Sequence, residues 1–426
     1  MSTLAPSGSF PGSSPVPETG PDAQLFDAFG SRPKARRIAS ADEALAAARA
    51  LAPLLAEGAA RRDAERDLPF AEVEAFSQTG LWALQIPPQW GGPGLPTAVV
   101  SKVFQIIAAA DPSIAQTAQN HYCFVEHIVN LGTETQKRFY LDRVLHGDRL
   151  GNGFSESAGK SVREVTTRIV RHGDGYRLSG QKFYSTGALF AHWIPVSAID
   201  ENDVPVVTIL PADAPGLHVV DDWSGFGQRT TASGTIRLDN VPVRPDQLIQ
   251  TRKAYEVPTA AGPYAQINHA AIDIGIADGA LQAAVKFVRG RSRPWIDANV
   301  EAASQDPLII TEFGRLFYRL HAAETLLERA SNLLDEARVR PGDARAVAEA
   351  SLAVAEARVA GDEIALEASS RLFELAGSRA ALKADNLDRF WRNARVHTLH
   401  DPVRWKHFAI GNYYLNSVTP PRHPWI

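Results

Sequence analysis

The sequence contains very little cysteine, no long apolar run and no excess of one charge. Its single cysteine, Cys123, excludes an intramolecular disulfide and any zinc or iron–sulfur site that needs several cysteines. Because no run of about eighteen apolar residues occurs, we expect no membrane-spanning helix. The 426 residues carry 44 Lys and Arg against 48 Asp and Glu, a net charge of −4, which argues against nucleic acid as a partner. These counts predict a globular, cytoplasmic protein and leave its chemistry open.

The chain begins with a segment that is rich in proline, serine and glycine. Residues 1–24 contain no Lys or Arg and no apolar stretch, which argues against a secretory signal. Such a composition buries too little apolar area to offset the entropy lost on ordering, so we expect a disordered tail over residues 1–38. Ser40 and Glu43 then form an S-x-x-E capping box, which predicts the start of the first helix.

Three regions follow this tail. Residues 39–150 have helical periodicity, interrupted by a Gly- and Pro-rich loop at 87–94, and we expect a helical N-terminal domain. Residues 151–255 contain short strand-like runs between turns, such as the hairpin turn at Gly173-Asp174-Gly175, which predicts a β domain. Over residues 256–416 the helical period returns in long stretches with short connections, which is typical of a bundle, and 417–426 form a C-terminal tail. Asp343 is placed to cap one of these helices, and another has an apolar repeat on one face at Leu316, Leu320, Ala323, Leu327, Ala330 and Leu334. The predicted fold is mainly α with a central β domain.

The densest group of histidines lies near the C-terminus. His397 and His400 are three residues apart, so on a helix they would share a face, and Asp401 and Pro402 follow directly. Three interpretations are open here: a metal site, a general acid–base histidine at a helix end, or satisfied structural histidines. Because no H-E-x-x-H motif or cysteine ligand accompanies the pair, we expect no metal and keep the other two interpretations of His400.

Two further features bear on cofactor binding. Small hydroxyl residues adjoin glycine at Ser185-Thr186-Gly187, where a backbone can approach a planar ligand closely, although an ordinary strand end is the alternative. Arginines gather at expected helix ends, at 289–293 and at Arg379, although most arginines are solvated surface residues. No glycine-rich phosphate loop is present, so separate arginines would have to hold any phosphate.

The domain order and several motifs together resemble the acyl-CoA dehydrogenase superfamily. The matching segments are Gly91-Gly92-Pro93-Gly94, Gly180 to Gly187, Asp222 to Gly234, Arg289, Arg293-Pro294-Trp295 and Phe390 to Pro402. Within the superfamily they resemble the flavin-dependent monooxygenase branch, in particular the oxidoreductases of bacterial sulfur acquisition and the dibenzothiophene monooxygenases. The resemblance implies a helical N-domain, a β-barrel-like middle domain and a C-terminal four-helix bundle, assembled as a homotetramer with flavin between the middle domain and the bundle.

The resemblance also implies roles for individual residues. Positions that match flavin-lining residues are Asn152, Ser155, Thr186, Trp223 and Ser233. Arg293 and Arg379 match residues that hold the flavin phosphate, Arg293 across a subunit interface, and His400 matches the histidine beside the flavin ring. On the substrate side, the matching residues are Gln116 and Asn120, followed by His121, a lining too polar for a large polycyclic aromatic compound.

The implied activity is oxygenation of a small organosulfur compound by O2 and reduced FMN, with Thr186 and His400 as catalytic groups and a separate NAD(P)H-dependent flavin reductase as partner. The same arginines would also serve FAD. An alternative is an acyl-CoA dehydrogenase with bound FAD and Asp401 as its base. Aspartate is shorter than the glutamate those enzymes carry there and would fall about an ångström short of the substrate proton, so the sequence favours the monooxygenase. A flavin-free binding protein is the third interpretation.

Overall fold

The computed structural model describes residues 34–157, 161, 164–249 and 257–426. Most of the expected N-terminal tail lies outside these residues. Its described part packs against the helical domain, because Ala35 and Ile38 are buried and the backbone N–H of Arg36 donates to the carbonyl oxygen of Gln78 over 3.0 Å. Residues just before the predicted helix cap at Ser40 are therefore already packed onto the domain.

The N-terminal domain is helical, as predicted. Its helices are α2 (Ala41–Ala56), α3 (Ala59–Glu65), α4 (Phe70–Gln78), α5 (Thr97–Ala110), α6 (Pro112–Leu131) and α7 (Glu134–Leu145). The Ser40 hydroxyl accepts the backbone N–H of Glu43 at the start of α2, which confirms the predicted cap. The long helix α6 was not expected as a separate element, yet its start has a local signal: Asp111 accepts the N–H of Ser113, and Pro112 lies in the first turn.

The middle region forms one seven-stranded mixed sheet. Its strands are β1 (Arg168–His172), β2 (Gly175–Lys182), β3 (Trp193–Ile199), β4 (Pro205–Pro211), β5 (Leu217–Val219), β6 (Ile236–Val243) and β7 (Leu248–Ile249). The order across the sheet is β5-β6-β2-β1-β3-β4-β7, and among the described strands only β1 and β3 pair parallel. The predicted turn at Gly173 joins β1 to β2, and Leu178, Ile194 and Ile236 belong to the apolar core of this domain.

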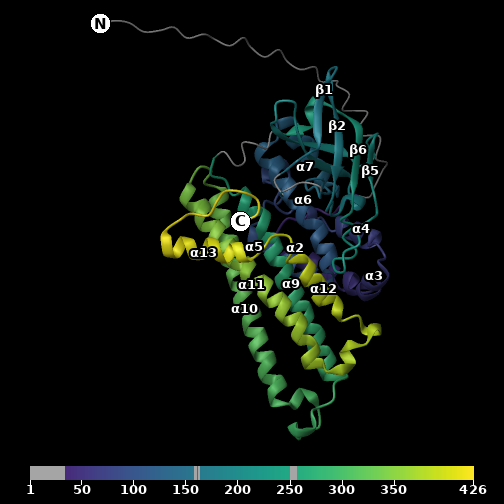
Figure 1. Cartoon of the computed structure of the whole chain (residues 1–426), viewed down its shortest axis with the longest axis vertical. Helices are drawn as coiled ribbons and strands as arrows, with labels where there is room; N and C mark the ends of the chain where they lie inside the picture. Colours follow the sequence, from purple (N-terminus) through teal and green to yellow (C-terminus); the bar gives the residue numbers. More distant parts are fainter. Residues whose placement is uncertain (1–33, 158–160, 162–163, 250–256) are drawn as a thin grey trace, which may run out of the picture. The chain divides into compact units, whose positions relative to one another are not determined.

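The C-terminal region is a helical bundle. Its helices are α9 (Ala261–Gly290), α10 (Pro307–Arg338), α11 (Ala344–Ala376), α12 (Asp388–His397) and α13 (Arg404–Asn416). Figure 1 shows α9, α10 and α11 side by side, and α9 also packs against α5, α6 and α12. The buried face of α10 is the predicted one, with Leu316, Leu320, Ala323, Leu327, Ala330 and Leu334. Asp343 caps α11 as predicted, and α11 ends at Gly377, whose φ is 81°.

The last residues of the chain return to the bundle. Residues 417–426 contain no helix or strand, but the carbonyl oxygen of Pro424 accepts from Gln266 Nε2 over 2.7 Å. The carbonyl oxygen of Trp425 accepts from Lys406 Nζ over 3.1 Å, and Ile426 is buried. The expected C-terminal tail is therefore packed onto α9 and α13.

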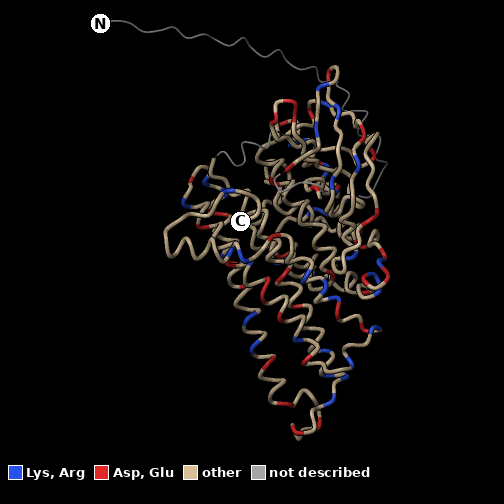
Figure 2. Tube along the Cα trace, in the orientation of Figure 1, with Lys and Arg blue, Asp and Glu red and all other residues tan. Residues whose placement is uncertain are grey.

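Acidic and basic side chains are intermixed along the described chain (Figure 2), as the small net charge predicts. Many of them form ion pairs on the surface of the bundle, such as Arg329 on α10 with Glu356 on α11. None of the helices in the described ranges combines the length and the apolar character that a membrane span needs.

Candidate active site

A directed chain of hydroxyl groups lies in the loops that flank the sheet. Ser233 Oγ lies 2.7 Å from both Thr186 Oγ1 and Thr231 Oγ1, and Thr231 Oγ1 donates to the carbonyl oxygen of Gln228 over 2.9 Å. Each hydroxyl has one hydrogen, so once Thr231 donates to Gln228, Ser233 must donate to Thr231 and Thr186 to Ser233. The lone pairs of Thr186 Oγ1 are left as acceptors for a ligand, at a position that the sequence predicted.

These loops hold unusual backbone conformations. Tyr184, Gln228 and Ala232 have φ of 57°, 50° and 51°, in the left-handed region that side chains other than glycine rarely adopt. Such residues cost on the order of 1–3 kcal/mol each and persist where the surroundings fix them. Here Trp223 Nε1 donates to the carbonyl oxygen of Gln228 over 2.9 Å, and Asn152 Nδ2 donates to that of Tyr184 over 3.0 Å. Two of the predicted flavin-lining residues therefore fix the loops that carry the hydroxyl chain.

The same loops contain buried polar groups that no other described group satisfies. Ser185 Oγ and both side-chain atoms of the Gln228 amide are buried and have no hydrogen-bond partner. Leaving a buried polar group unpaired costs about 1–3 kcal/mol, so such groups are typical of a site that a polar ligand completes. The donors and acceptors of Ser185, Thr186 and Gln228 fit the polar edge of a flavin ring, while Phe183, whose ring centroid is 6.3 Å from that of Trp223, adds an aromatic surface.

Two close contacts connect these loops to the helices. The backbone N–H of Gln228 donates to Asn393 Oδ1 on α12 over 2.7 Å, and a Cβ on Gly227 would collide with the carbonyl oxygen of Arg392. A Cβ on Gly187 would lie 3.4 Å from the carbonyl oxygen of Thr117 on α6. The loops that carry the hydroxyl chain therefore pack against α6 and α12.

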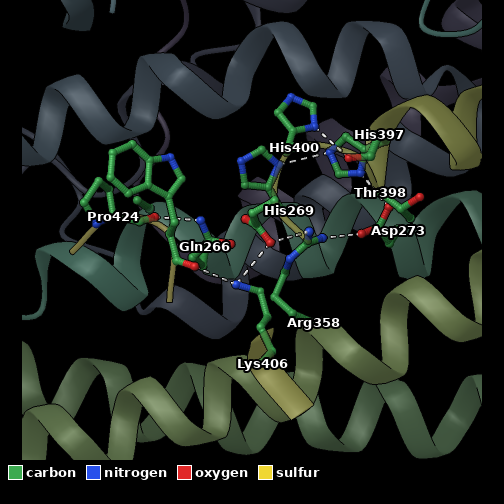
Figure 3. A network of polar contacts seen from close by, with 12 residues as sticks. Gln266, His269, Asp273, Arg358, His397, Thr398, His400, Lys406 and Pro424 are labelled. Carbon is green, nitrogen blue, oxygen red and sulfur yellow. Dashed lines mark hydrogen bonds and ion pairs between the residues drawn. The ribbon is translucent and has the colours of Figure 1, made fainter. Parts of the chain in front are cut away.

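A second polar group, which we call the histidine cluster, consists of His269 on α9, His397 on α12 and His400 just after α12 (Figure 3). Their ligand-forming atoms all lie within 4.8 Å of one another. His397 Nε2 lies 3.1 Å from His269 Nδ1, and His400 Nδ1 donates to the carbonyl oxygen of His397 over 2.6 Å. His269 and His397 are buried whereas His400 is exposed, so His400 is the ring that a small molecule can reach.

Gln116 on α6 joins two of these rings. Its Oε1 lies 3.0 Å from His397 Nε2, and its Nε2 lies 2.9 Å from His400 Nε2. Both ends of the amide are therefore used within the protein. Thr117, the next residue, lies against Gly187, so α6 contacts both the loop that carries Thr186 and the histidine cluster.

A buried set of charges supports the histidine cluster. His397 Nδ1 donates to Asp273 Oδ1 over 2.5 Å, and Asp273 also pairs with Arg358. Asp401 Oδ1 lies 3.1 Å from Lys406 Nζ and 3.5 Å from Arg358 Nη2. Burial alone would raise the pKa of Asp401, but Arg358 and Lys406 lower it overall. A carboxylate held ionised by two cations is a weak base, so we do not assign Asp401 as a catalytic base.

The protein also changes the acid–base properties of His400. The pKa of His400 is lowered to about 4, first because the surrounding groups desolvate the ring and then because His397 lies close to it. The open edge of the His400 ring moderates the desolvation. The pKa of His269 shifts in the same direction: burial and the other two histidines lower it strongly. His400 is therefore neutral at pH 7 unless a proton is supplied to it.

His121 does not have the substrate-side position that the sequence predicted. A helix turns by about 100° per residue, so Asn120 lies about 40° and His121 about 140° from Gln116 around α6. Asn120 shares the face of Gln116, whereas His121 is fully buried, with Nε2 2.9 Å from the carbonyl oxygen of Trp82 and Nδ1 accepting the N–H of Leu150 over 3.0 Å. Burial lowers the pKa of His121 to about 3, so it is a neutral structural residue.

The remaining predicted cofactor residues are not all at this site. The Ser155 carbonyl oxygen accepts the N–H of Phe183 over 2.9 Å, while its side chain is exposed. Arg293 and Arg379 are exposed near the far end of α9, where Arg379 Nη1 donates to the carbonyl oxygen of Arg291 over 3.3 Å. At 1.5 Å per residue, that end of α9 is about 30 Å from His269, so these arginines lie far from the histidine cluster.

Three parts of the chain match sequence models of one family. Residues 42–148 match the N-terminal domain of acyl-CoA dehydrogenase, 153–241 its middle domain and 267–405 its C-terminal domain. The chain belongs to the acyl-CoA dehydrogenase family. This assignment confirms the predicted fold class, with its helical, β and helical parts in the predicted order.

Within the acyl-CoA dehydrogenase family, the chain is similar to monooxygenases. Dibenzothiophene monooxygenase of Rhodococcus qingshengii is 30% identical over 402 residues, which are 90% of this chain and 96% of that protein. The probable FMNH2-dependent monooxygenase SfnC of Pseudomonas putida is 30% identical over 385 residues, 88% of this chain and 96% of that protein. The predicted resemblance to the monooxygenase branch is confirmed.

Solved structures of this family agree with these sequence matches. FMN-bound TdsC from Paenibacillus sp. A11-2 has a TM-score of 0.86 and 29% identity, and the match covers 90% of this chain and 100% of TdsC. Methanesulfinate monooxygenase MsuC from Pseudomonas fluorescens has a TM-score of 0.82 and 30% identity, with 89% and 98% of the two chains covered.

Several residues of the site were not predicted from the sequence. They are His269, Asp273, Arg358 and Lys406, which surround His397 and His400, and Gln228 and Thr231, which extend the hydroxyl chain. His269 and Asp273 are four residues apart on a predicted helix, so they share a face, and this spacing could have indicated a buried polar group. Arg358 and Lys406 have no comparable local signal.

Proposed function

We propose that this protein is a flavin-dependent monooxygenase that uses reduced FMN and O2 to oxygenate a small organosulfur compound. A separate NAD(P)H-dependent flavin reductase would supply the reduced FMN. The proposal is supported by relatives that are described as dibenzothiophene, methanesulfinate and FMNH2-dependent monooxygenases, and by the contacts of α6 with both His400 and the loop that carries Thr186.

One observation carries the proposal, namely the direction of the hydroxyl chain. Because Thr186 must donate its hydrogen to Ser233, its oxygen is an acceptor toward the ligand. Reduced flavin carries a ring N–H that oxidised flavin lacks, so this acceptor suits the reduced form. When bound, reduced FMN supplies the electrons that activate O2. Ser185 and Gln228 would hold its polar edge, and the Phe183 and Trp223 rings would exclude water.

In this proposal, His400 handles the proton. Its Nε2 has a lone pair that the Gln116 amide holds, its Nδ1 is fixed by the carbonyl oxygen of His397, and its ring edge is exposed. A neutral histidine so placed can accept a proton from the reacting group or return one to it. Asn120, on the same face of α6 as Gln116, would line the substrate side, and an amide there favours a small polar sulfinate, sulfone or sulfonate over a polycyclic compound.

The proposal includes a homotetramer. Arg293 and Arg379 lie about 30 Å along α9 from the histidine cluster, so a flavin phosphate that they bind would belong to a neighbouring subunit. Exposed Trp295 and Ile296 beside Arg293 support a subunit contact at this end of the bundle. The proposal also retains a cytoplasmic location and the domain limits 39–150, 151–255 and 256–416.

The test is isotope incorporation. Protein loaded anaerobically with reduced FMN is mixed with ¹⁸O2 and a panel of sulfinates, sulfones, sulfonates and thioethers, and products are analysed by mass spectrometry. We expect one labelled oxygen atom in the product of at least one compound, with the other in water. If, for every compound, all the O2 consumed when reduced FMN is reoxidised appears as hydrogen peroxide, the proposal is wrong.

A further inference from the structure

The amide of Gln116 lies between two histidines whose other ring nitrogens are both donors. His397 Nδ1 donates to Asp273, whose carboxylate is ionised because it also pairs with Arg358. His400 Nδ1 donates to the carbonyl oxygen of His397, which can only accept. Both Nδ1 atoms therefore carry a hydrogen. The charge of each ring then depends only on whether its Nε2 also carries one.

The two Nε2 atoms face opposite ends of the same amide. An amide has one acceptor end, the oxygen, and one donor end, the NH2 group. The Nε2 that faces the oxygen must carry a hydrogen, which makes that ring an imidazolium. The Nε2 that faces the NH2 group must be bare, which makes that ring neutral. If the amide is turned by 180°, the two rings exchange roles, so the number of imidazolium rings is one in either orientation.

The neighbours of His397 favour the charge on that ring in the resting state. Its nitrogens face two acceptors, Asp273 Oδ1 and Gln116 Oε1, and its Nε2 also lies 3.1 Å from His269 Nδ1. His269 is buried beside two other histidines and stays neutral. The other charged groups facing the cluster are Arg358, Asp401 and Lys406, which bind one another. A second positive charge on His400, with its ring centroid 5.0 Å from that of His397, would be repelled.

We propose that Gln116 is a positioning residue that makes His397 and His400 share a single excess proton. In the resting protein His397 is the imidazolium and His400 is neutral, with its Nε2 lone pair held by the amide. When His400 takes a proton at Nε2, the Gln116 amide turns, the Nε2 proton of His397 leaves for solvent, and the count stays at one. The consequence for catalysis rests on the proposed function, whereas the proton count does not.

A metal ion bound by the three histidines is the competing arrangement. It would need a bare Nε2 on both His397 and His400 and would displace the Gln116 amide from between them. The two arrangements differ in the number of imidazolium rings, which is one for the shared proton and zero for the metal.

The experiment counts protons on the rings by NMR. Long-range ¹H–¹⁵N spectra of ¹⁵N-histidine-labelled, FMN-loaded protein at pH 7 distinguish imidazolium from neutral rings, and His397→Gln and His400→Gln assign the two signals. We expect one imidazolium, at His397. In Gln116→Glu, a carboxylate accepts from both rings, so the count rises to two. Gln119→Leu is the matched control, because Gln119 is another buried glutamine on α6 whose Nε2 donates to the carbonyl oxygen of Ala265 instead. Its count stays at one.

Turnover gives the second measurement. Gln116→Glu holds His400 protonated, so the oxygenation rate of this variant should fall by about tenfold or more and rise only at high pH. The rate of Gln119→Leu should stay within about twofold of that of the unsubstituted protein. Three results would each overturn the proposal. They are a count of two imidazolium rings or none in the unsubstituted protein, a metal that co-purifies at one equivalent, and an unchanged count in Gln116→Glu. The NMR count tests the shared proton even if no oxygenation is found. Failure of the proposed function can therefore be distinguished from failure of the shared-proton proposal.

Discussion

Thr186 and Ser233 lie 47 positions apart in the sequence, and their hydroxyl oxygens are 2.7 Å apart. Because the hydrogens run from Thr186 through Ser233 to Thr231 and the Gln228 carbonyl, the backbone of one loop decides what the side chain of another offers to a ligand. Replacing the Thr186 or Ser233 hydroxyl therefore changes the hydrogen bonds that the site offers to a ligand, with little change in its shape.

Replacing Thr186 with valine should weaken the binding of reduced FMN more than that of oxidised FMN. Valine has nearly the same shape but no acceptor for the ring N–H that only the reduced form carries. Loss of one hydrogen bond of about 1–1.5 kcal/mol weakens reduced FMN by about tenfold, which anaerobic fluorescence titration measures. Thr208→Val is the control, because the Thr208 hydroxyl is buried in β4 and has no hydrogen-bond partner among the described residues. Equal losses for both redox forms would contradict the directed chain.

Adding one methyl group at Gly227 should uncouple the flavin loops from the helices. A Cβ there collides with the carbonyl oxygen of Arg392, so Gly227→Ala must move the loop away from α12 and reduce FMN binding. The matched control is Gly314→Ala in α10, where a Cβ meets nothing within 4 Å and helix propensity predicts stabilisation by up to about 1 kcal/mol. Calorimetric titration with FMN and thermal unfolding measure both effects. Unchanged FMN affinity in Gly227→Ala would show that this contact is not needed.

Arg358 should be far more important to stability than an arginine of the same helix that is exposed. Arg358→Met leaves Asp273 buried without its guanidinium partner and Asp401 with Lys406 alone, and breaking a buried ion pair in this way costs about 3–5 kcal/mol. Arg345, near the start of α11, pairs with Glu349 in solvent, so Arg345→Met should leave the urea midpoint unchanged. Similar midpoints for the two variants would contradict the role given to the buried charges.

The ion pair between Glu156 and Lys182 should make stability depend on acid pH. Although burial raises it, hydrogen bonds from Lys182 and Thr166 lower the pKa of Glu156 to about 2, below its usual value of 4.5. A lowered folded-state pKa adds stability above 4.5 that is lost as the pH falls toward 2, because the unfolded chain binds the proton first. The Tm difference between the unsubstituted protein and Glu156→Gln should therefore shrink between pH 5 and about 2.5, and exposed Glu201→Gln should show no such trend. A constant difference would be the contrary result.

Local patterns predicted much of the fold. The apolar repeat of α10, the Ser40 cap and the turn at Gly173 depend on residues close together in the sequence, and each is present. Helix α6 was missed although its start carries the same kind of local signal, with Asp111 as the cap and Pro112 in the first turn.

The candidate site was predicted only in part, for a physical reason. Thr186, Ser233 and His400 belong to recognisable segments, but the partners of Gln116 are 281 and 284 residues away, so no local pattern indicates them. His121 shows the opposite limit: it adjoins Asn120 in the sequence, yet one helical step turns it away from the face shared with Gln116.

The packing of the chain end has a practical consequence. Lys406 is held on one side by the carbonyl oxygen of Trp425 and on the other by Asp401, the residue next to His400. An affinity tag fused directly after Ile426 would disturb the contact between Trp425 and Lys406. Lys406 also holds Asp401 next to His400, so the tag would affect the candidate active site. For immobilisation or dye labelling, exposed Asp174 at the tip of the β1–β2 hairpin is the safer attachment point, because no described residue lies within 4 Å of a Cβ placed on its neighbour Gly173.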